Sequence, residues 1–137
     1  MIICAECKNS FNKPTNYIYC SNRCQRDHEY KVYISRWKNG EVDGTRGIKT
    51  KNFSGHVRRY IFEKFNNKCS ICGWGQINPK SGCITLEVDH IDGDPSNNRE
   101  NNLRLLCPNC HSLTPYFRNL NYGNGRNWRK SKYIKNT

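Results

Sequence analysis

The apolar residues of this chain follow a helical spacing in two stretches. The first stripe has the spacing i, i+3, i+4, i+7 and is formed by Tyr30, Tyr33, Ile34 and Trp37. Ser21 or Asn22 can cap the start of this helix, and Asn39-Gly40 ends it. The second stripe is formed by Val57, Tyr60, Ile61 and Phe65. It predicts a second helix that runs from a cap at Ser54 to about Asn66.

Beyond the second helix the pattern changes to the period of a strand. Apolar side chains alternate with polar ones at Ile84, Leu86 and Val88. This predicts a short strand that ends in the pair Asp89-His90. Residues 92–98 form a long turn, and residues 102–106 form a second strand. A helix should then open at Cys107, because proline is tolerated at the early position of Pro108, and Pro115 should end it.

The cysteines fall into two sets of closely spaced pairs. The first set is Cys4, Cys7, Cys20 and Cys24. The second set is Cys69, Cys72, Cys107 and Cys110. Each set suits a tetrahedral Zn²⁺ ion with a structural role, because four thiolates leave no open position for chemistry. For the first set the alternative is four free cysteines in a core. The ninth cysteine, Cys83, is assigned no ligand role.

The composition explains why metal would be needed. Only 35% of the 137 residues are hydrophobic, so a core built from them is thin, and small modules of this kind use metal or disulfide staples. We find no signal peptide or membrane span, which favours a reducing, cytoplasmic location and metal over disulfides. The fold class expected is small α+β. The domains expected are a zinc module with a helix (1–38), a basic linker (39–54), a second zinc-stabilised domain (55–118) and a basic aromatic tail (119–137).

The formal net charge of +12 favours a polyanionic partner. Acidic membranes also attract basic chains, but no polybasic amphipathic helix is present in the sequence. In the tail, cations alternate with aromatic residues that can stack on bases; the alternative is a disordered, solubilising tail. The linker can contact phosphates, or it can serve only to connect the two domains. The candidate DNA contacts are Arg99, Arg104, Arg118, Arg126, Arg129 and Lys130. For Arg99 and Arg104 the alternative is a surface salt bridge.

The second cysteine set encloses residues that could bind a metal ion and take part in catalysis. Zinc bound there would clamp the loop that contains Asp89 and His90, and His111 directly follows the ligand Cys110. One carboxylate and one imidazole can hold a divalent cation and leave positions open for water and phosphate oxygens. The remaining histidine can deprotonate a water molecule. The alternatives are that both histidines are structural, or that His111 replaces a cysteine as zinc ligand.

Residues 56–118 resemble the HNH endonuclease family, whose zinc-binding fold is the ββα-metal fold. The resemblance is carried by residues 86–93, Asn97-Asn98, Asn102-Leu103 and the run from Leu106 through Cys107 and Cys110 to His111.

The resemblance implies roles for individual residues. Asp89 and His111 would ligate a catalytic Mg²⁺ or Mn²⁺, His90 would be the general base, and Asn102 would orient the loop that carries His90. It implies hydrolysis of phosphodiester bonds in double-stranded DNA, with 5′-phosphate and 3′-hydroxyl products. By analogy with small family members, we expect a phage or homing-type nuclease. The alternative is a zinc-stabilised DNA-binding protein that does not cleave.

Overall fold

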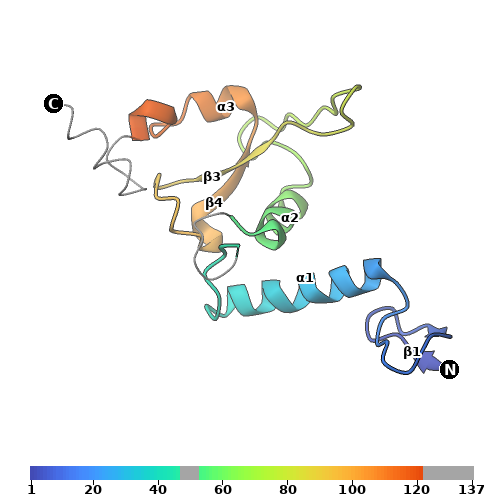
Figure 1. The fold of residues 1–137 in the computed structure, drawn as a ribbon. Helices are drawn as coiled ribbons and strands as arrows, with labels where there is room; N and C mark the ends of the chain where they lie inside the picture. Colours follow the sequence, from blue (N-terminus) through green and yellow to red (C-terminus); the bar gives the residue numbers. More distant parts are fainter. Residues whose placement is uncertain (47–52, 122–137) are drawn as a thin grey trace, which may run out of the picture. The chain divides into compact units, whose positions relative to one another are not determined.

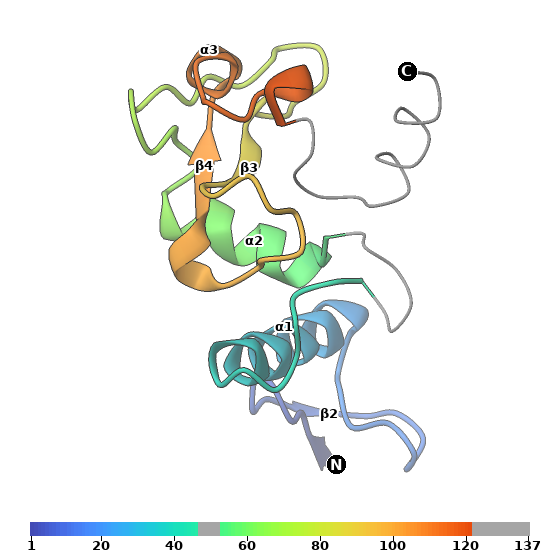
Figure 2. The ribbon, with the colours of Figure 1, turned by 90° about the vertical axis from the view of Figure 1, so that its left-hand side faces the viewer.

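The computed structural model describes residues 1–46 and 53–121, which form two compact units (Figures 1 and 2). The first unit is Met1–Val42, and the second begins at Asp43. The middle of the expected linker lies outside the described residues, as does the tail beyond residue 121 with Arg126, Arg129 and Lys130. Each unit is described by itself.

The N-terminal unit is a cysteine-bearing turn region followed by one long helix. Strand β1 (Ile2–Ile3) pairs antiparallel with β2 (Ser10–Phe11). Helix α1 (Asn22–Lys38) is capped by Ser21, whose side chain accepts a hydrogen bond from the Cys24 N–H. The helix ends at Asn39, as predicted. Three of the four stripe residues are buried: Tyr30, Ile34 and Trp37.

An ionic contact ties α1 to the turn that carries the first cysteines. The Glu6 carboxylate contacts the Lys31 ammonium group, and it lies 3.3 Å from His28 Nδ1. The hydrogen bond from Lys31 lowers the pKa of Glu6 below its usual value. An ion pair therefore connects α1 to the turn that carries the first cysteines.

The C-terminal unit places two helices against a two-stranded hairpin. Helix α2 (Gly55–Lys64) begins at its cap Ser54, as predicted. Strand β3 (Glu87–His90) pairs antiparallel with β4 (Leu103–Leu106), so that Asp89 lies opposite Arg104 and His90 opposite Leu103. The remaining elements are the 3₁₀ turns η1 (Glu100–Asn102) and η2 (Arg118–Asn121) and the helix α3 (Pro108–Ser112).

The prediction that the first strand starts at Ile84 was wrong. The Leu86 N–H donates to the Ile84 carbonyl at 2.9 Å, which turns the chain locally. Ile84 instead forms an isolated bridge with Ile77, and the ladder with β4 begins only at Glu87. The alternation of apolar residues persists through this bend, because Leu86 is buried while Thr85 and Glu87 are exposed.

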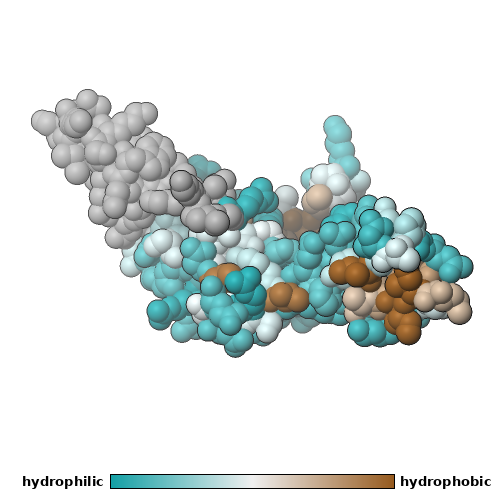
Figure 3. All heavy atoms as spheres, turned by 60° about the horizontal axis from the view of Figure 1, so that its bottom comes forward, coloured by the Kyte–Doolittle hydropathy of each residue, from teal (hydrophilic) through white to brown (hydrophobic). Residues whose placement is uncertain are grey.

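The core of the C-terminal unit is small and lies between α2 and the hairpin (Figure 2). Its largest fully buried side chains are Val57, Ile61, Leu86, Leu105 and Leu106. The burial of so few residues agrees with the expectation of a thin core. Figure 3 shows one face of the molecule, which is mostly hydrophilic, with several hydrophobic residues gathered at one end and a few isolated ones elsewhere.

Helix α3 is a single short turn that the sequence predicts well. Pro108 occupies its first position, Cys107 caps it, and Leu113 ends it two residues before Pro115. The two described ends of the expected linker also meet, because Thr45 forms a bridge with Phe53 and the Ser54 N–H donates to the Gly44 carbonyl at 2.9 Å. Among the described residues, the helices are all too short or too polar to cross a membrane.

Candidate active site and metal centres

The second cysteine set converges on one point of the C-terminal unit. The sulfur atoms of Cys69, Cys72, Cys107 and Cys110 all lie within 4.8 Å of one another. Two of these residues belong to the turn after α2 and two to the start of α3. The turn is also bonded to β4, since the Ser70 N–H donates to the Leu105 carbonyl at 2.8 Å. The geometry thus joins α2, β4 and α3 at one place.

The protonation chemistry of this cluster suits a divalent cation. Burial raises the pKa of the Cys69 thiol, but hydrogen bonds from the backbone of Cys72 and Cys107 outweigh it and lower the pKa to about 6. Burial and the neighbouring thiols raise the pKa of Cys110 to about 12. Deprotonation of Cys69 is therefore favoured, whereas deprotonation of Cys110 is disfavoured by the neighbouring thiols. A bound Zn²⁺ would favour the thiolate form of all four cysteines, so the donor set fits zinc.

The first cysteine set shows the same arrangement in the N-terminal unit. The sulfur atoms of Cys4, Cys7, Cys20 and Cys24 also lie within 4.8 Å of one another. Burial raises the pKa of Cys4, yet backbone hydrogen bonds lower it to about 6, while hydrogen bonds with Cys24 and Cys7 raise the pKa of Cys20 to about 12. Cys83 belongs to neither cluster, and its sulfur lies 3.6 Å from the Ser81 carbonyl oxygen.

The structure brings Asp89 and His111 together, from β3 and α3. His111 Nε2 lies 3.8 Å from Asp89 Oδ1, and the other Asp89 oxygen accepts from Arg104 Nε at 2.9 Å. The side chain of Asp89 is 12% exposed and that of His111 is 26% exposed. A carboxylate oxygen and an imidazole nitrogen therefore face each other at a site that solvent reaches, and this pair fits a divalent cation with open positions.

Glu87 completes this group, and the sequence analysis missed it. Its Oε2 lies 2.9 Å from His111 Nδ1, on the opposite side of the ring from Asp89. A carboxylate accepts the Nδ1 proton and leaves the Nε2 lone pair directed at Asp89. The signal was available, because residues two apart on a strand share a face, so Glu87 had to lie beside Asp89.

His90 is held by different partners. Its Nε2 lies 2.7 Å from Asn98 Oδ1, and its ring meets the Phe53 ring edge to face, with centroids 5.9 Å apart. Asn98 is buried, at 4% exposure. Asn102 was predicted to orient the loop that carries His90; the ring itself contacts Asn98.

Asn102 is buried at 8% exposure and bonds the loop backbone. Its Oδ1 accepts from the Asp92 N–H at 3.1 Å, and its Nδ2 donates to Asp92 Oδ1 at 2.9 Å and to the Asn97 carbonyl at 2.8 Å. Burial raises the pKa of Asp92, but hydrogen bonds from the Asn97 and Asn102 side chains and the Asp94 backbone outweigh it and lower the pKa. These bonds close the loop between β3 and η1.

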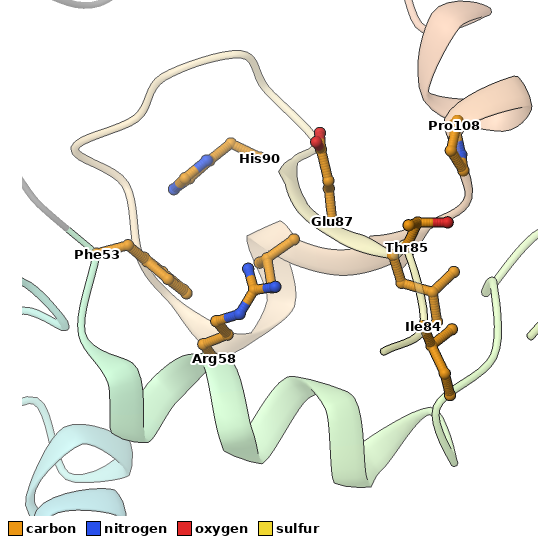
Figure 4. Close-up of a pocket in the computed structure, with 9 residues that line it drawn as sticks. Phe53, Arg58, Ile84, Thr85, Glu87, His90 and Pro108 are labelled. Atoms are coloured by element: carbon orange, nitrogen blue, oxygen red, sulfur yellow. The ribbon is translucent and has the colours of Figure 1, made fainter. Parts of the chain in front are cut away.

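A cavity of about 460 Å³ lies next to His90, between α2 and β3 (Figure 4). Arg58 reaches into it from α2, Phe53 lines it from the segment just before α2, and His90 lines it from β3. Its full lining is Phe53, Arg58, Ile84, Thr85, Leu86, Glu87, Val88, His90 and Pro108. Phe53 and Arg58 were given no predicted role, because no local pattern in the sequence marks them.

Of the residues predicted to bind DNA, three lie in the described part of the chain. Arg104 pairs with Asp89, so the salt bridge that was weighed as its alternative is present. Arg99 is exposed. Arg118 is exposed, and its guanidinium carbon lies 4.9 Å from the Phe117 ring centroid.

Comparison with known proteins bears directly on this region. Residues 75–112 match the family model described as HNH endonuclease. The chain is 35% identical over 99 residues to H-N-H endonuclease F-TflIV of Escherichia phage T5, an alignment that covers 72% of this chain and 40% of that relative. The chain thus spans less than half of the length of this relative. No solved structure matches it significantly. On these two matches, residues 75–112 form an HNH endonuclease region.

Proposed function

We propose that this protein is a metal-dependent endonuclease that hydrolyses phosphodiester bonds in double-stranded DNA. The observation that carries the proposal is the convergence of Asp89 and His111 beside the neighbouring His90, within the region that matches the family. The net charge of +12 favours a polyanionic substrate. The phage origin of the T5 relative supports a phage or homing type.

Asp89 and His111 would hold the catalytic cation, with Mg²⁺ or Mn²⁺ as the candidates. When bound, the cation supplies stabilisation of the negative charge on the phosphate and on the leaving oxygen. Glu87 would act through His111, because it accepts the Nδ1 proton at 2.9 Å and keeps Nε2 free for the cation.

His90 would act as the general base. The Asn98 amide oxygen only accepts hydrogen bonds, so His90 Nε2 donates to it, and in the neutral ring Nδ1 carries the lone pair. That nitrogen would remove the proton of the attacking water. Asn102 would keep His90 in place, since its three hydrogen bonds close the loop that follows.

The two cysteine clusters would each bind one structural Zn²⁺. The adjacency of Cys110 and His111 means that zinc bound at the second cluster would also fix the start of α3, and with it the position of His111. Elemental analysis of purified protein should therefore give about two zinc ions per chain.

The test is incubation of the purified protein with supercoiled plasmid, with Mg²⁺ or Mn²⁺ and with EDTA. We expect metal-dependent nicking, and we expect His90→Ala to lower its rate by roughly 10²- to 10⁴-fold, the usual contribution of general acid–base catalysis. DNA binding and zinc content should stay near wild type.

His56→Ala is the matched control, because it removes a histidine of the same unit that lies outside the candidate site. Its nicking rate should be within about twofold of wild type. Equal cleavage by His90→Ala would refute the assigned base. Absence of cleavage by the wild type, with DNA binding retained, would favour the zinc-stabilised binding protein.

A further inference from the structure

The cavity next to His90 has no role in the function proposed so far. His90 and Glu87 both contribute to its lining, so it is continuous with the candidate active site. Its volume of about 460 Å³ lies within the range of small-molecule sites. Ile84, Val88 and Pro108 supply apolar surface. A group that enters it from the site would therefore meet both apolar and charged contacts.

Arg58 is the cation of this cavity (Figure 4). Its guanidinium carbon lies 4.7 Å from the Phe62 ring centroid, and within residues 1–46 and 53–121 it forms no ion pair with a carboxylate. The next two basic residues of α2 differ in this respect. Arg59 Nε lies 2.9 Å from Glu63, and Lys64 Nζ lies 3.4 Å from Glu100. Of these three, only Arg58 keeps its charge available for a ligand.

The one anion in the lining, Glu87, has a partner of its own. Its carboxylate bonds His111 Nδ1 at 2.9 Å. The Arg58 charge is therefore available to an external anion. A guanidinium binds phosphate oxygens through several donors at once, which makes it a preferred phosphate ligand.

We propose that this cavity is a nucleotide subsite, in which Arg58 binds a backbone phosphate of the DNA strand next to the phosphodiester that is cleaved. The apolar wall of Ile84, Val88 and Pro108 then receives the sugar and base of the same nucleotide. This proposal rests on the proposed function, because it uses the strand that the active site cleaves. Arg58 would bind and position that strand.

The first test measures DNA binding by fluorescence anisotropy, without added Mg²⁺ or Mn²⁺ and in a His90→Ala background, as a function of KCl concentration. Cleavage is absent under these conditions, so the result stands whether or not the wild type cuts plasmid. Loss of one phosphate contact should reduce the slope of log K against log salt by about 0.9. We expect this reduction for Arg58→Ala and recovery of the slope in Arg58→Lys.

Arg59→Ala is the matched control, because it removes the same charge from the neighbouring position of α2. Its slope should be unchanged, since Arg59 is paired with Glu63. An unchanged slope in Arg58→Ala would overturn the proposal, and so would an equal reduction in Arg59→Ala, which would indicate only a general effect of charge. Thermal unfolding and zinc content should match the parent protein in all variants.

The second test fills the cavity. Thr85 is an exposed residue of its lining and precedes β3. Thr85→Trp should obstruct the subsite and weaken DNA binding, whereas Thr85→Ala should bind as the parent does. Parent-like binding by a folded Thr85→Trp would overturn the part of the proposal that places a nucleotide in the cavity.

Discussion

The hydrogen bonds of Asn102 allow a quantitative prediction about the loop that carries His90. Replacement by alanine removes three bonds, two to Asp92 and one to the Asn97 carbonyl. The side chain is 8% exposed, so water replaces these bonds only after the loop opens. Asn102→Ala should therefore destabilise the hairpin without removing apolar contacts from the core.

The magnitude follows from the kinds of bond lost. A neutral hydrogen bond contributes about 0.5–1.5 kcal/mol, and one to a charged group about 1.5–3 kcal/mol. One of the three bonds goes to the Asp92 carboxylate. Water can hydrogen-bond to part of the surface that an opened loop exposes. We therefore expect the free energy of unfolding to fall by about 2–3 kcal/mol, near the lower end of the sum over the three hydrogen bonds.

Hydrogen exchange of the β3 and β4 amides measures this loss in the relevant unit. A destabilisation of about 2–3 kcal/mol corresponds to a roughly 30- to 150-fold decrease in protection, since about 1.4 kcal/mol is a factor of 10. Asn101→Ala is the matched control, because this neighbour is exposed and its loss should change stability by less than about 0.5 kcal/mol. A decrease below about threefold in Asn102→Ala, or an equal decrease in Asn101→Ala, would refute the assigned role of Asn102.

Three further predictions concern metal and pH. Cys69→Ser should reduce the zinc content from two to about one per chain and unfold the C-terminal unit, which amide spectra would detect; native-like dispersion would contradict the clamp. Glu87→Gln should weaken Mn²⁺ binding by roughly 10- to 100-fold in calorimetry with zinc content unchanged. Asp92 has a pKa below its ordinary value of 3.8, so its stabilisation is present above pH 3.8 and is lost as the pH falls through its folded-state pKa. The difference in unfolding free energy between wild type and Asp92→Asn should therefore shrink below pH 3.8. A difference that stays constant with pH would contradict the stabilising role of the ionised Asp92 carboxylate.

The sequence predicts most of the local structure of this chain because local signals determine it. Ser21 and Ser54 cap the two long helices as their side chains indicate. The apolar stripes are buried at Tyr30, Ile34, Trp37, Val57 and Ile61 and half-buried at their other positions. Pro108 and Pro115 bound α3 for reasons of backbone geometry alone. The start of β3 was mispredicted because the bend at Ile84 depends on a single backbone hydrogen bond, which leaves no trace in hydropathy.

The candidate site was predictable only where residues lie close in sequence to a recognisable motif. Asp89 and His111 were found through the pattern, and the structure places them 3.8 Å apart. Asn98 and Arg58 were not assigned, because their relation to His90 depends on how the loop folds back and on how α2 packs against the hairpin. A polar residue in an asparagine-rich turn has many possible partners, and only the three-dimensional arrangement selects one.

The second cysteine cluster would compensate for the thin core and would also position residues of the candidate site. Strands of four residues and a helix of five bury too little surface to fix a side chain within the tolerance that catalysis needs. Cys110 immediately precedes His111, while Ser70, beside Cys69, is bonded to Leu105 of β4. Zinc at this cluster would therefore set the distance between α3 and the hairpin, and with it the separation of His111 from Asp89. It follows that a chelator strong enough to remove zinc should abolish cleavage even when Mg²⁺ is later restored, whereas loss of the catalytic cation alone should be reversible.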